Sequence, residues 1–149
     1  MTTYQGSCRC GQLRVDCVGE PVRVSVCHCL DCQRRSGSAF AKQVRWPDGD
    51  VSMAGHYKSW QRVADSGHVA NYRFCPNCGS TVSYVIEGWP GLIAVPLGAF
   101  AGADALPDLP APGFSVYEHR KHRWVEISGD QVKHSSSPSL DRAPGLGLE

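Results

Sequence analysis

The chain has 149 residues, of which 42% are hydrophobic and 19% are charged, and its formal net charge is +1. Such a composition is typical of a soluble globular protein, and this length can bury a core without covalent cross-links. The small net charge argues against a dedicated nucleic-acid-binding protein, because such proteins carry a marked basic excess. No apolar run has the length of a membrane span, and the N-terminal residues lack the features of a signal peptide, so we expect a cytoplasmic protein with no membrane partner.

Alternation of apolar and polar residues predicts β-strands along most of the chain. The clearest runs are residues 13–17, 22–27 and 70–75, and in the last two a cysteine ends the face opposite the apolar one. Further strand candidates are residues 39–46, 56–63, 80–87, 91–97 and 122–128. Glycines and prolines between these runs mark hairpins and loops.

Helical signals are few. Asp31 is placed to cap a single turn over residues 32–36, and Gly37 would end that turn. Residues 101–114 contain three prolines and little periodicity, which predicts a surface loop. We therefore expect a mainly β fold with little helix, in one domain over residues 1–134, followed by a flexible C-terminal tail over residues 135–149.

The chain contains eight cysteines, and all but one lie in short clusters. The clusters are a C-x-C pair, a C-x-C-x-x-C triplet and a C-x-x-C pair, formed by Cys8 and Cys10, by Cys27, Cys29 and Cys32, and by Cys75 and Cys78. The remaining Cys17 shares the apolar face of its strand with Leu13 and Val15, where a buried and inert thiol is expected.

Metal binding explains these clusters better than disulfide or redox chemistry. A C-x-C pair closes only a small strained ring, and disulfides are rare in a reducing cytoplasm. A thioredoxin-like motif opens a helix, whereas after Cys75-Pro76-Asn77-Cys78 a glycine follows and a strand pattern resumes at Thr81. Zinc, by contrast, prefers thiolate ligands, and four of them close a structural site.

The two cysteine pairs are each followed directly by a glycine, Gly11 or Gly79, as in zinc knuckles. Together they predict a closed structural zinc site on Cys8, Cys10, Cys75 and Cys78. The triplet of Cys27, Cys29 and Cys32 then supplies three ligands with an open fourth position, which is the layout of a catalytic zinc site. In an extended segment the His28 side chain points away from its two neighbours, so we expect a packed or hydrogen-bonded histidine, or a proton shuttle, and not the fourth ligand.

Three segments resemble the motifs of the glutathione-dependent formaldehyde-activating enzyme family, which includes centromere-protein-V-like members. These segments are residues 6–11 (GSCRCG), 26–40 (VCHCLDCQRRSGSAF) and 74–80 (FCPNCGS), and the resemblance runs from about residue 6 to about residue 128. It implies a β-tent fold of antiparallel sheets pinned by zinc. It also implies one structural zinc and one catalytic zinc on the same two cysteine sets. Ser115 stands where many relatives have a histidine.

The resemblance further implies a carbon–sulfur lyase that acts on a thiol–aldehyde adduct such as S-hydroxymethylglutathione. Glutathione and formaldehyde, or a related thiol and aldehyde, would be its small-molecule partners. A zinc ion keeps a bound thiol ionised and therefore nucleophilic. Arg34 and Arg35 could bind the carboxylates of a glutathione-like co-substrate, whereas Phe40 and Trp60 are expected in the core.

Two other functions stay open at this point. The chain could be a non-catalytic zinc-binding module in which both metal sites are structural, or it could sense metals or thiols through reversible loading of the triplet. The ligand that completes the triplet separates these hypotheses from the enzymatic one. The identity of the thiol and aldehyde, and whether the chain forms a homodimer, are also left open by the sequence.

Overall fold

The computed structural model describes residues 1–64, 67–102 and 108–136. The chain forms two compact units, the first built from Met1–Val22 and Val44–Asp108 and the second from Arg23–Gln43 and Leu109–Glu149. Strands dominate the described residues, which contain one short α-helix. The prediction of a mainly β protein with little helix is therefore confirmed.

The first unit begins with a three-stranded antiparallel sheet. Its strands are β1 (Thr3–Ser7), β2 (Arg14–Val18) and β5 (Val51–Ala54), in the order β1-β2-β5. Val15 and Cys17 of the central strand are completely buried, while Arg14, the first residue of that strand, is exposed. The alternation predicted for this segment is confirmed, and the isolated Cys17 is a buried thiol as expected. Sequence analysis did not predict β1 and β5, which are short.

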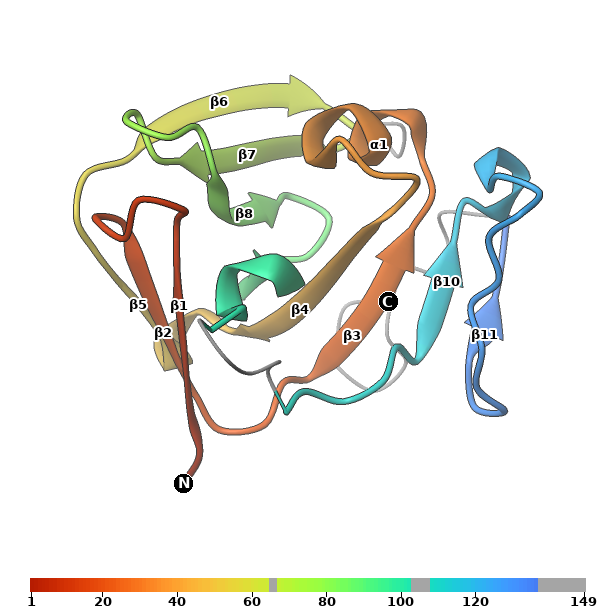
Figure 1. Cartoon of the computed structure of the whole chain (residues 1–149), viewed down its shortest axis with the longest axis horizontal. Helices are drawn as coiled ribbons and strands as arrows, with labels where there is room; N and C mark the ends of the chain where they lie inside the picture. Colours follow the sequence, from red (N-terminus) through yellow and green to blue (C-terminus); the bar gives the residue numbers. More distant parts are fainter. Residues whose placement is uncertain (65–66, 103–107, 137–149) are drawn as a thin grey trace. The chain divides into compact units, whose positions relative to one another are not determined.

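The same unit contains an antiparallel meander, which runs from yellow to green in Figure 1. Its strands are β6 (Lys58–Val63), β7 (Val69–Phe74), β8 (Thr81–Ile86) and β9 (Leu92–Pro96). Tyr72, Tyr84 and Ala94 pack together on one face with Ala70. The ring of Trp60 stacks on Tyr72 with centroids 6.3 Å apart, but 57% of Trp60 is exposed because β6 is the last strand in the sheet order. The expectation that Trp60 is a core residue is therefore wrong.

The second unit contains a small parallel arrangement of strands. β10 (Phe114–Val116) pairs in parallel with both β3 (Arg23–Cys27) and β11 (Lys133–His134), and the three lie side by side in Figure 1. All five residues of β3 are buried, so the expectation of one core face and one open face is wrong for this strand. The guanidinium carbon of Arg23 lies 3.6 Å from the ring centroid of Phe114, a cation–π contact that lets a charged side chain sit inside.

The helix α1 (Leu30–Ser36) follows β3 directly. Its N-cap is Cys29, whose Sγ accepts a hydrogen bond from the Cys32 amide, so the prediction that Asp31 caps the turn is wrong. Asp31 lies in the first turn instead, where a carboxylate favours the positive end of the helix dipole. Gly37 ends the helix with a φ of 68°, a left-handed conformation that glycine adopts without strain, as predicted.

The strand β4 (Ala41–Pro47) contains a boundary between the units along the sequence, since the second unit includes residues up to Gln43 and the first resumes at Val44. Single turns of 3-10 helix follow at η1 (Asp48–Asp50), η2 (Leu97–Phe100) and η3 (Glu118–Arg120). The predicted strand over residues 122–128 is wrong. A turn forms there, with the Val125 amide donating to the His122 carbonyl, and Trp124 is 75% exposed.

Two predicted segments fall partly or mostly outside the described residues. Of the predicted loop 101–114, residues 103–107 are not described, and its last residue belongs to β10. Of the predicted tail 135–149, only residues 135 and 136 are described, and the amide of Ser135 donates to the carbonyl of Ser115.

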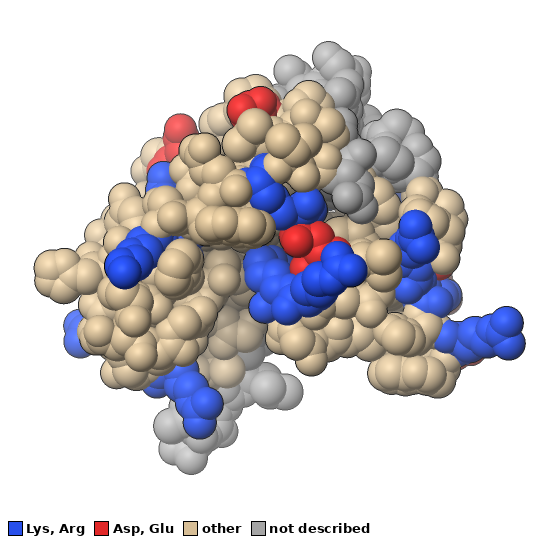
Figure 2. Space-filling view, turned by 90° about the horizontal axis from the view of Figure 1, so that it is seen from above, with Lys and Arg blue, Asp and Glu red and all other residues tan. Residues whose placement is uncertain are grey.

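Charge is distributed in patches over the surface. On the face shown in Figure 2, Lys and Arg side chains form several separate groups, one of them beside acidic side chains, with uncharged surface between them. This pattern agrees with the formal net charge of +1. Within the described residues, no helix has both the length and the apolar character needed to cross a membrane.

Candidate metal centres

The first candidate centre lies in the first unit, where two tight turns meet. One turn follows β1, and in it the amide of Cys8 donates to the carbonyl of Leu13 at 2.8 Å. The other follows β7, and in it the amide of Gly79 donates to the carbonyl of Cys75 at 2.8 Å. The glycines after the two cysteine pairs have φ values of 82° and 78°, which few other residues adopt without strain. The sequence therefore specifies two knuckle-like turns, each of which carries two thiols.

The four sulfurs of these turns are close enough to share one ion. The Sγ atoms of Cys8, Cys10, Cys75 and Cys78 all lie within 4.8 Å of one another. Cys10 Sγ is 3.6 Å from Cys8 Sγ and 3.7 Å from Cys75 Sγ. Zinc with Zn–S bonds of about 2.3 Å holds its sulfurs roughly 3.8 Å apart in a tetrahedron, whereas a disulfide needs about 2.05 Å. The donor set and its spacing fit a zinc ion held by four thiolates.

Polar groups of the surrounding chain point at these sulfurs. Gln12 Nε2 donates to Cys75 Sγ at 2.9 Å, and the Leu13 amide donates to Cys8 Sγ at 3.3 Å. Ser80 Oγ lies 3.4 Å from Cys78 Sγ. Such donors orient metal ligands and stabilise their negative charge. Sequence analysis did not assign these roles to Gln12 and Ser80, because neither residue type marks a metal site by its spacing.

In the absence of a cation, Cys10 and Cys78 ionise at very different pH values. Hydrogen bonds from the Ser80 side chain and amide and from the Cys10 amide lower the pKa of Cys78 to about 5. The backbone amide of Gln12 favours the thiolate of Cys10. The hydrogen bonds of Cys10 with the neighbouring thiols and its desolvation outweigh this effect and raise the pKa of Cys10 to about 11. Four thiolates so close together repel one another, and a divalent cation removes this repulsion.

The second candidate centre lies in the second unit, at the junction of β3 and α1. Cys27 ends the strand, Cys29 caps the helix and Cys32 lies in its first turn, and their sulfurs are within 4.8 Å of one another. Cys27 and Cys29 are buried with Val116, while Cys32 is only partly buried. The strand-to-helix turn thus brings the three thiols of the triplet together, as the sequence predicted. No fourth Cys, His, Asp or Glu joins this group within the described part of the chain.

The neighbouring thiols and burial favour the protonated forms of Cys27 and Cys32 without a metal. Hydrogen bonds with Cys29 and Cys32, followed by desolvation, raise the pKa of Cys27 well above its ordinary value. For Cys32, the hydrogen bond with Cys27 and the positive charge of Arg35 favour the thiolate, but the hydrogen bond with Cys29 and burial outweigh them and raise the pKa to about 12. This cluster, too, needs a cation if all its members are to ionise.

His28 lies between two of these cysteines in sequence but does not join them. Its side chain is completely buried, and its Nε2 lies 2.9 Å from Ser115 Oγ on β10. Its ring packs 5.8 Å from that of Phe40, which is partly buried. Burial lowers the pKa of His28, so the imidazole is neutral near pH 7. The expectation that His28 is a packed, hydrogen-bonded histidine agrees with this geometry.

The Gln33 side chain links the helix to the segment after β10 through hydrogen bonds. Its Nε2 donates to the carbonyls of His28 at 2.9 Å and Arg120 at 3.2 Å, and its Oε1 lies 2.8 Å from His122 Nε2. Tyr117, which packs beside Cys27 and Cys29, has a φ of 57° and is the one non-glycine residue with positive φ among those described. Sequence analysis missed the roles of Gln33 and Tyr117, because both depend on contacts between distant segments.

Of the two predicted substrate-binding arginines, the structure places one close to the thiols. Both Arg34 and Arg35 lie in the last turn of α1, where cations favour the negative end of the helix dipole. Arg34 is exposed, whereas Arg35 is partly buried and its charge acts on the pKa of Cys32.

These features define a class: a mainly β protein with one four-cysteine and one three-cysteine centre of metal-binding type. The family model described as glutathione-dependent formaldehyde-activating enzyme matches residues 3–120. The chain belongs to this family, which confirms the resemblance noted in its cysteine motifs. No curated protein matches the chain at a significant level.

A solved structure supports the fold assignment. The crystal structure of a Rhodobacter sphaeroides protein, a target of the Northeast Structural Genomics consortium, is similar with a TM-score of 0.53. The two sequences are 19% identical, and the match covers 71% of this chain and 97% of that one. At this level of identity the similarity concerns the fold alone.

Proposed function

We propose that the protein is a zinc-dependent carbon–sulfur lyase that makes and breaks adducts of a small thiol with an aldehyde. Membership of the family named for glutathione-dependent formaldehyde activation supports glutathione and formaldehyde as the substrate pair. The observation that carries the proposal is the cluster of Cys27, Cys29 and Cys32. Its three sulfurs are close enough to bind one ion, and no fourth Cys, His, Asp or Glu joins them within the described residues.

The donor set fits a catalytic type of zinc site. Three thiolates suit zinc, and three protein ligands leave one coordination position for a substrate. When bound, zinc lowers the pKa of a thiol so that the thiolate predominates near neutral pH, which supplies the nucleophile for an aldehyde carbon or the leaving group when the adduct breaks. The four-cysteine set of the first unit fits a structural zinc, which contributes on the order of 10–16 kcal/mol of apparent binding free energy in small zinc-dependent modules.

The chain's own residues shape the approach to the three-cysteine cluster. Cys27 and Cys29 are buried behind Val116, with Phe114 and Tyr117 packed beside them, and this shields them from water. Cys32 is only partly buried, so we assign the substrate's approach to its side of the cluster. The hydrogen bond to Ser115 keeps the His28 imidazole out of the ligand set and so preserves three sulfurs.

Arg35 is the better candidate of the two arginines for binding the substrate. Its positive charge already acts on Cys32, so a peptide-like thiol held near that sulfur would bring a carboxylate within its reach. We assign Arg34, which is exposed in the same turn, a weaker steering role. All eight cysteines are unbridged thiols, which supports a reducing compartment, and we propose the cytoplasm.

The test uses zinc-loaded protein and NMR to measure how fast S-hydroxymethylglutathione interconverts with free glutathione and formaldehyde. We expect exchange faster than in buffer, two zinc ions per chain, and loss of both one zinc and the catalysed exchange in Cys29→Ser. Cys17→Ala is the matched control, because this buried thiol lies outside both clusters and burial raises its pKa to about 12, which keeps it neutral.

A further variant separates the two centres. Cys78→Ser removes a ligand of the four-cysteine set, and we expect it to lower the stability of the first unit along with its zinc content. If wild-type protein with two zinc ions exchanges the adduct no faster than buffer, the enzymatic proposal fails and a non-catalytic zinc-binding module takes its place. If the zinc of the three-cysteine cluster leaves with micromolar chelator while the other stays, sensing becomes the preferred function.

A further inference from the structure

A cavity on the β6–β9 meander is distinct from both cysteine clusters. Its volume is about 460 Å³, and all the residues that line it belong to the first unit. None of them is a cysteine. Cavities of this size commonly hold small organic ligands, with a mostly apolar lining and a few polar groups.

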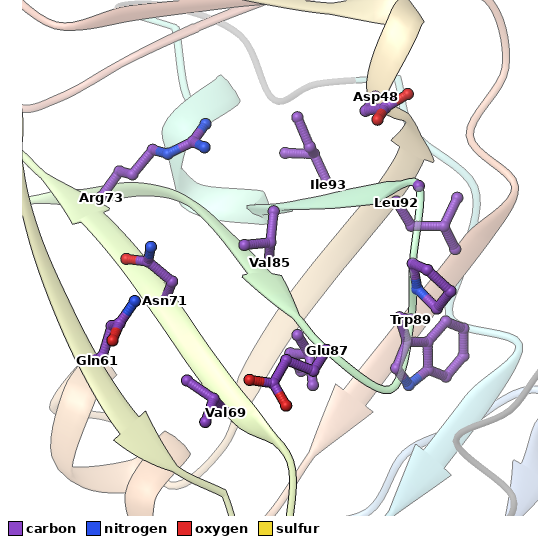
Figure 3. Close-up of a pocket in the computed structure, with 13 residues that line it drawn as sticks. Asp48, Gln61, Val69, Asn71, Arg73, Val85, Glu87, Trp89, Leu92 and Ile93 are labelled. Atoms are coloured by element: carbon purple, nitrogen blue, oxygen red, sulfur yellow. The ribbon is translucent and has the colours of Figure 1, made fainter.

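The floor of the cavity is the face of the meander opposite the tyrosine cluster. Gln61, Asn71 and Val85 are neighbours across β6, β7 and β8, and they alternate along their strands with the buried Tyr72 and Tyr84. Because successive side chains of a strand point to opposite sides, these residues share the other face. Figure 3 shows the side chains of Val69, Val85 and Ile93 rising from this floor, with Trp89 and Leu92 along one side.

Asn71 contributes its side-chain amide to the cavity floor, between Val69 and Arg73 on β7. Its Oδ1 is inaccessible to solvent and has no hydrogen-bond partner among the described residues. A buried polar atom without a partner is destabilising. In this conformation the oxygen does not open onto the cavity, so a ligand N–H reaches it only after the side-chain amide rotates.

Arg73 offers the cavity a positive charge that no described carboxylate neutralises. Its contacts are a long hydrogen bond of 3.8 Å from Nη1 to Met53 Sδ and a position 5.5 Å from the ring centroid of Tyr57. In Figure 3 the guanidinium reaches over the floor towards Val85 and Ile93. A guanidinium is always ionised and binds carboxylates through two parallel hydrogen bonds.

Two carboxylates line the cavity, one from Asp48 and one from Glu87, and Glu87 is the one that belongs to the meander. Glu87 lines the cavity next to Val69, to whose carbonyl the Glu87 amide donates at 3.0 Å. Along β7, Arg73 and Val69 are four residues apart, which is about 13 Å in a strand. Arg73, Asn71 and Glu87 therefore place a cation, an amide and an anion in a row, over a length slightly greater than the roughly 10–11 Å of an extended tripeptide.

We propose that this cavity binds a short zwitterionic peptide with apolar side chains, of about three residues. Its C-terminal carboxylate pairs with Arg73, an amide N–H donates to Asn71 Oδ1, and its N-terminal ammonium lies near Glu87. The apolar side chains contact Val85 and Ile93. The site uses no residue of either cysteine cluster, so it stands or falls independently of the lyase activity.

The test titrates trialanine, its C-terminal amide and its N-acetyl derivative into zinc-loaded wild-type protein, followed by NMR of the Asn71 side-chain amide and the Trp89 indole. We expect saturable shifts with trialanine, about tenfold weaker binding of the amide, and two- to fivefold weaker binding of the N-acetyl derivative, because Glu87 is exposed. Absence of saturable shifts, or equal affinities for the acid and its amide, would overturn the proposal without need of any variant.

Variants then assign the contacts. Arg73→Gln should remove the preference for the acid over the amide, Arg73→Lys should restore part of it, and Asn71→Leu, which keeps the volume, should weaken all three peptides. Lys58→Gln is the matched control, since it removes a cation from the same meander on the opposite face. If Lys58→Gln weakens trialanine as much as Arg73→Gln does, the attraction is a general charge effect and the assigned site is wrong.

Discussion

His28 Nε2 lies 2.9 Å from Ser115 Oγ, although the two residues are 87 positions apart in the chain. The serine hydroxyl also hydrogen-bonds with Glu118, whose carboxylate lies 2.5 Å from His134 Nδ1. A row of polar groups thus runs from the histidine beside the three-cysteine cluster to the surface of the second unit. Ser115 is its central member, because it contacts the groups on both sides.

Replacing Ser115 with alanine should destabilise the protein by about 1–3 kcal/mol, because the buried imidazole loses the partner of its Nε2. Urea unfolding of the zinc-loaded protein measures the effect. Ser128→Ala, an exposed serine of the same unit, is the control and should change the unfolding free energy by less than about 0.5 kcal/mol. Equal midpoints for the two variants would show that the His28 contact contributes nothing.

Replacing Gln12 with leucine should weaken zinc binding by the four-cysteine set by about 10–100-fold, the usual effect of losing a hydrogen bond to a metal ligand. Gln12 Nε2 donates to Cys75 Sγ, and the same amide group bridges to the backbone of His56. Competition with a coloured chelator gives the affinity. Gln5→Leu, on the exposed side of β1, should leave the affinity at the wild-type value. A Gln12 variant that holds zinc as tightly as Gln5→Leu contradicts the assigned role.

Replacing Gly55 with alanine should cost about 3 kcal/mol or more, from backbone strain and steric overlap together. Gly55 has a φ of 105°, and a Cβ there would lie 2.1 Å from the carbonyl oxygen of Gln12. Thermal unfolding measures the loss. Gly49→Ala is the matched control, since a Cβ at that position has no neighbour within 4 Å, and it should be close to neutral. Similar unfolding temperatures for both variants would mean that the turn relaxes without cost.

Glu118 should contribute stability that disappears in acid. Burial acts against its ionisation, but hydrogen bonds from His134 and Ser115 outweigh burial and lower the pKa of Glu118 below its ordinary 4.5. The contribution is therefore complete above about pH 4.5 and is lost as the pH falls through the lower pKa of the folded state.

The measurement compares wild type with Glu118→Gln by urea unfolding from pH 7 to pH 3. The difference should be largest near neutral pH, on the order of 1 kcal/mol or less because His134 is 43% exposed, and should shrink in acid. Glu126→Gln, at an exposed position of the same unit, corrects for the general effect of removing a charge. A difference that grows as the pH falls would contradict the lowered pKa.

Much of the local structure follows from the sequence alone. Period-two alternation predicted the strands that became β2 and β7, each of which buries every second side chain, and the further strand candidates include those that became β4, β6, β8 and β9. Gly37 ended the helix as expected, because only a left-handed residue turns the chain there. The alternation of residues 122–128 predicted a strand that does not exist, because no neighbouring strand pairs with this segment among the described residues.

The two candidate metal centres also differ in how far the sequence alone predicts them. The three-cysteine cluster lies within six successive residues, so a single strand-to-helix turn assembles it and the spacing sufficed to predict it. The four-cysteine set joins residues 65 positions apart, as in the contact of Cys10 with Cys75, and the sequence could support it only through the count of thiols and the flanking glycines. Gln12 and Ser80, which hydrogen-bond to the cysteine sulfurs, had no such signature in the sequence.

The sequence by itself thus determined the strand pattern, the helix end, the buried Cys17 and the number and grouping of the thiols, since these depend on neighbours along the chain. Only the tertiary structure decided that His28 faces Ser115, that both faces of β3 are buried, that Trp60 lies exposed on β6, and that Asn71 and Arg73 face a cavity. The physical reason is that each of these outcomes depends on which distant segment packs against the residue, and the local pattern is the same whether that segment is present or absent.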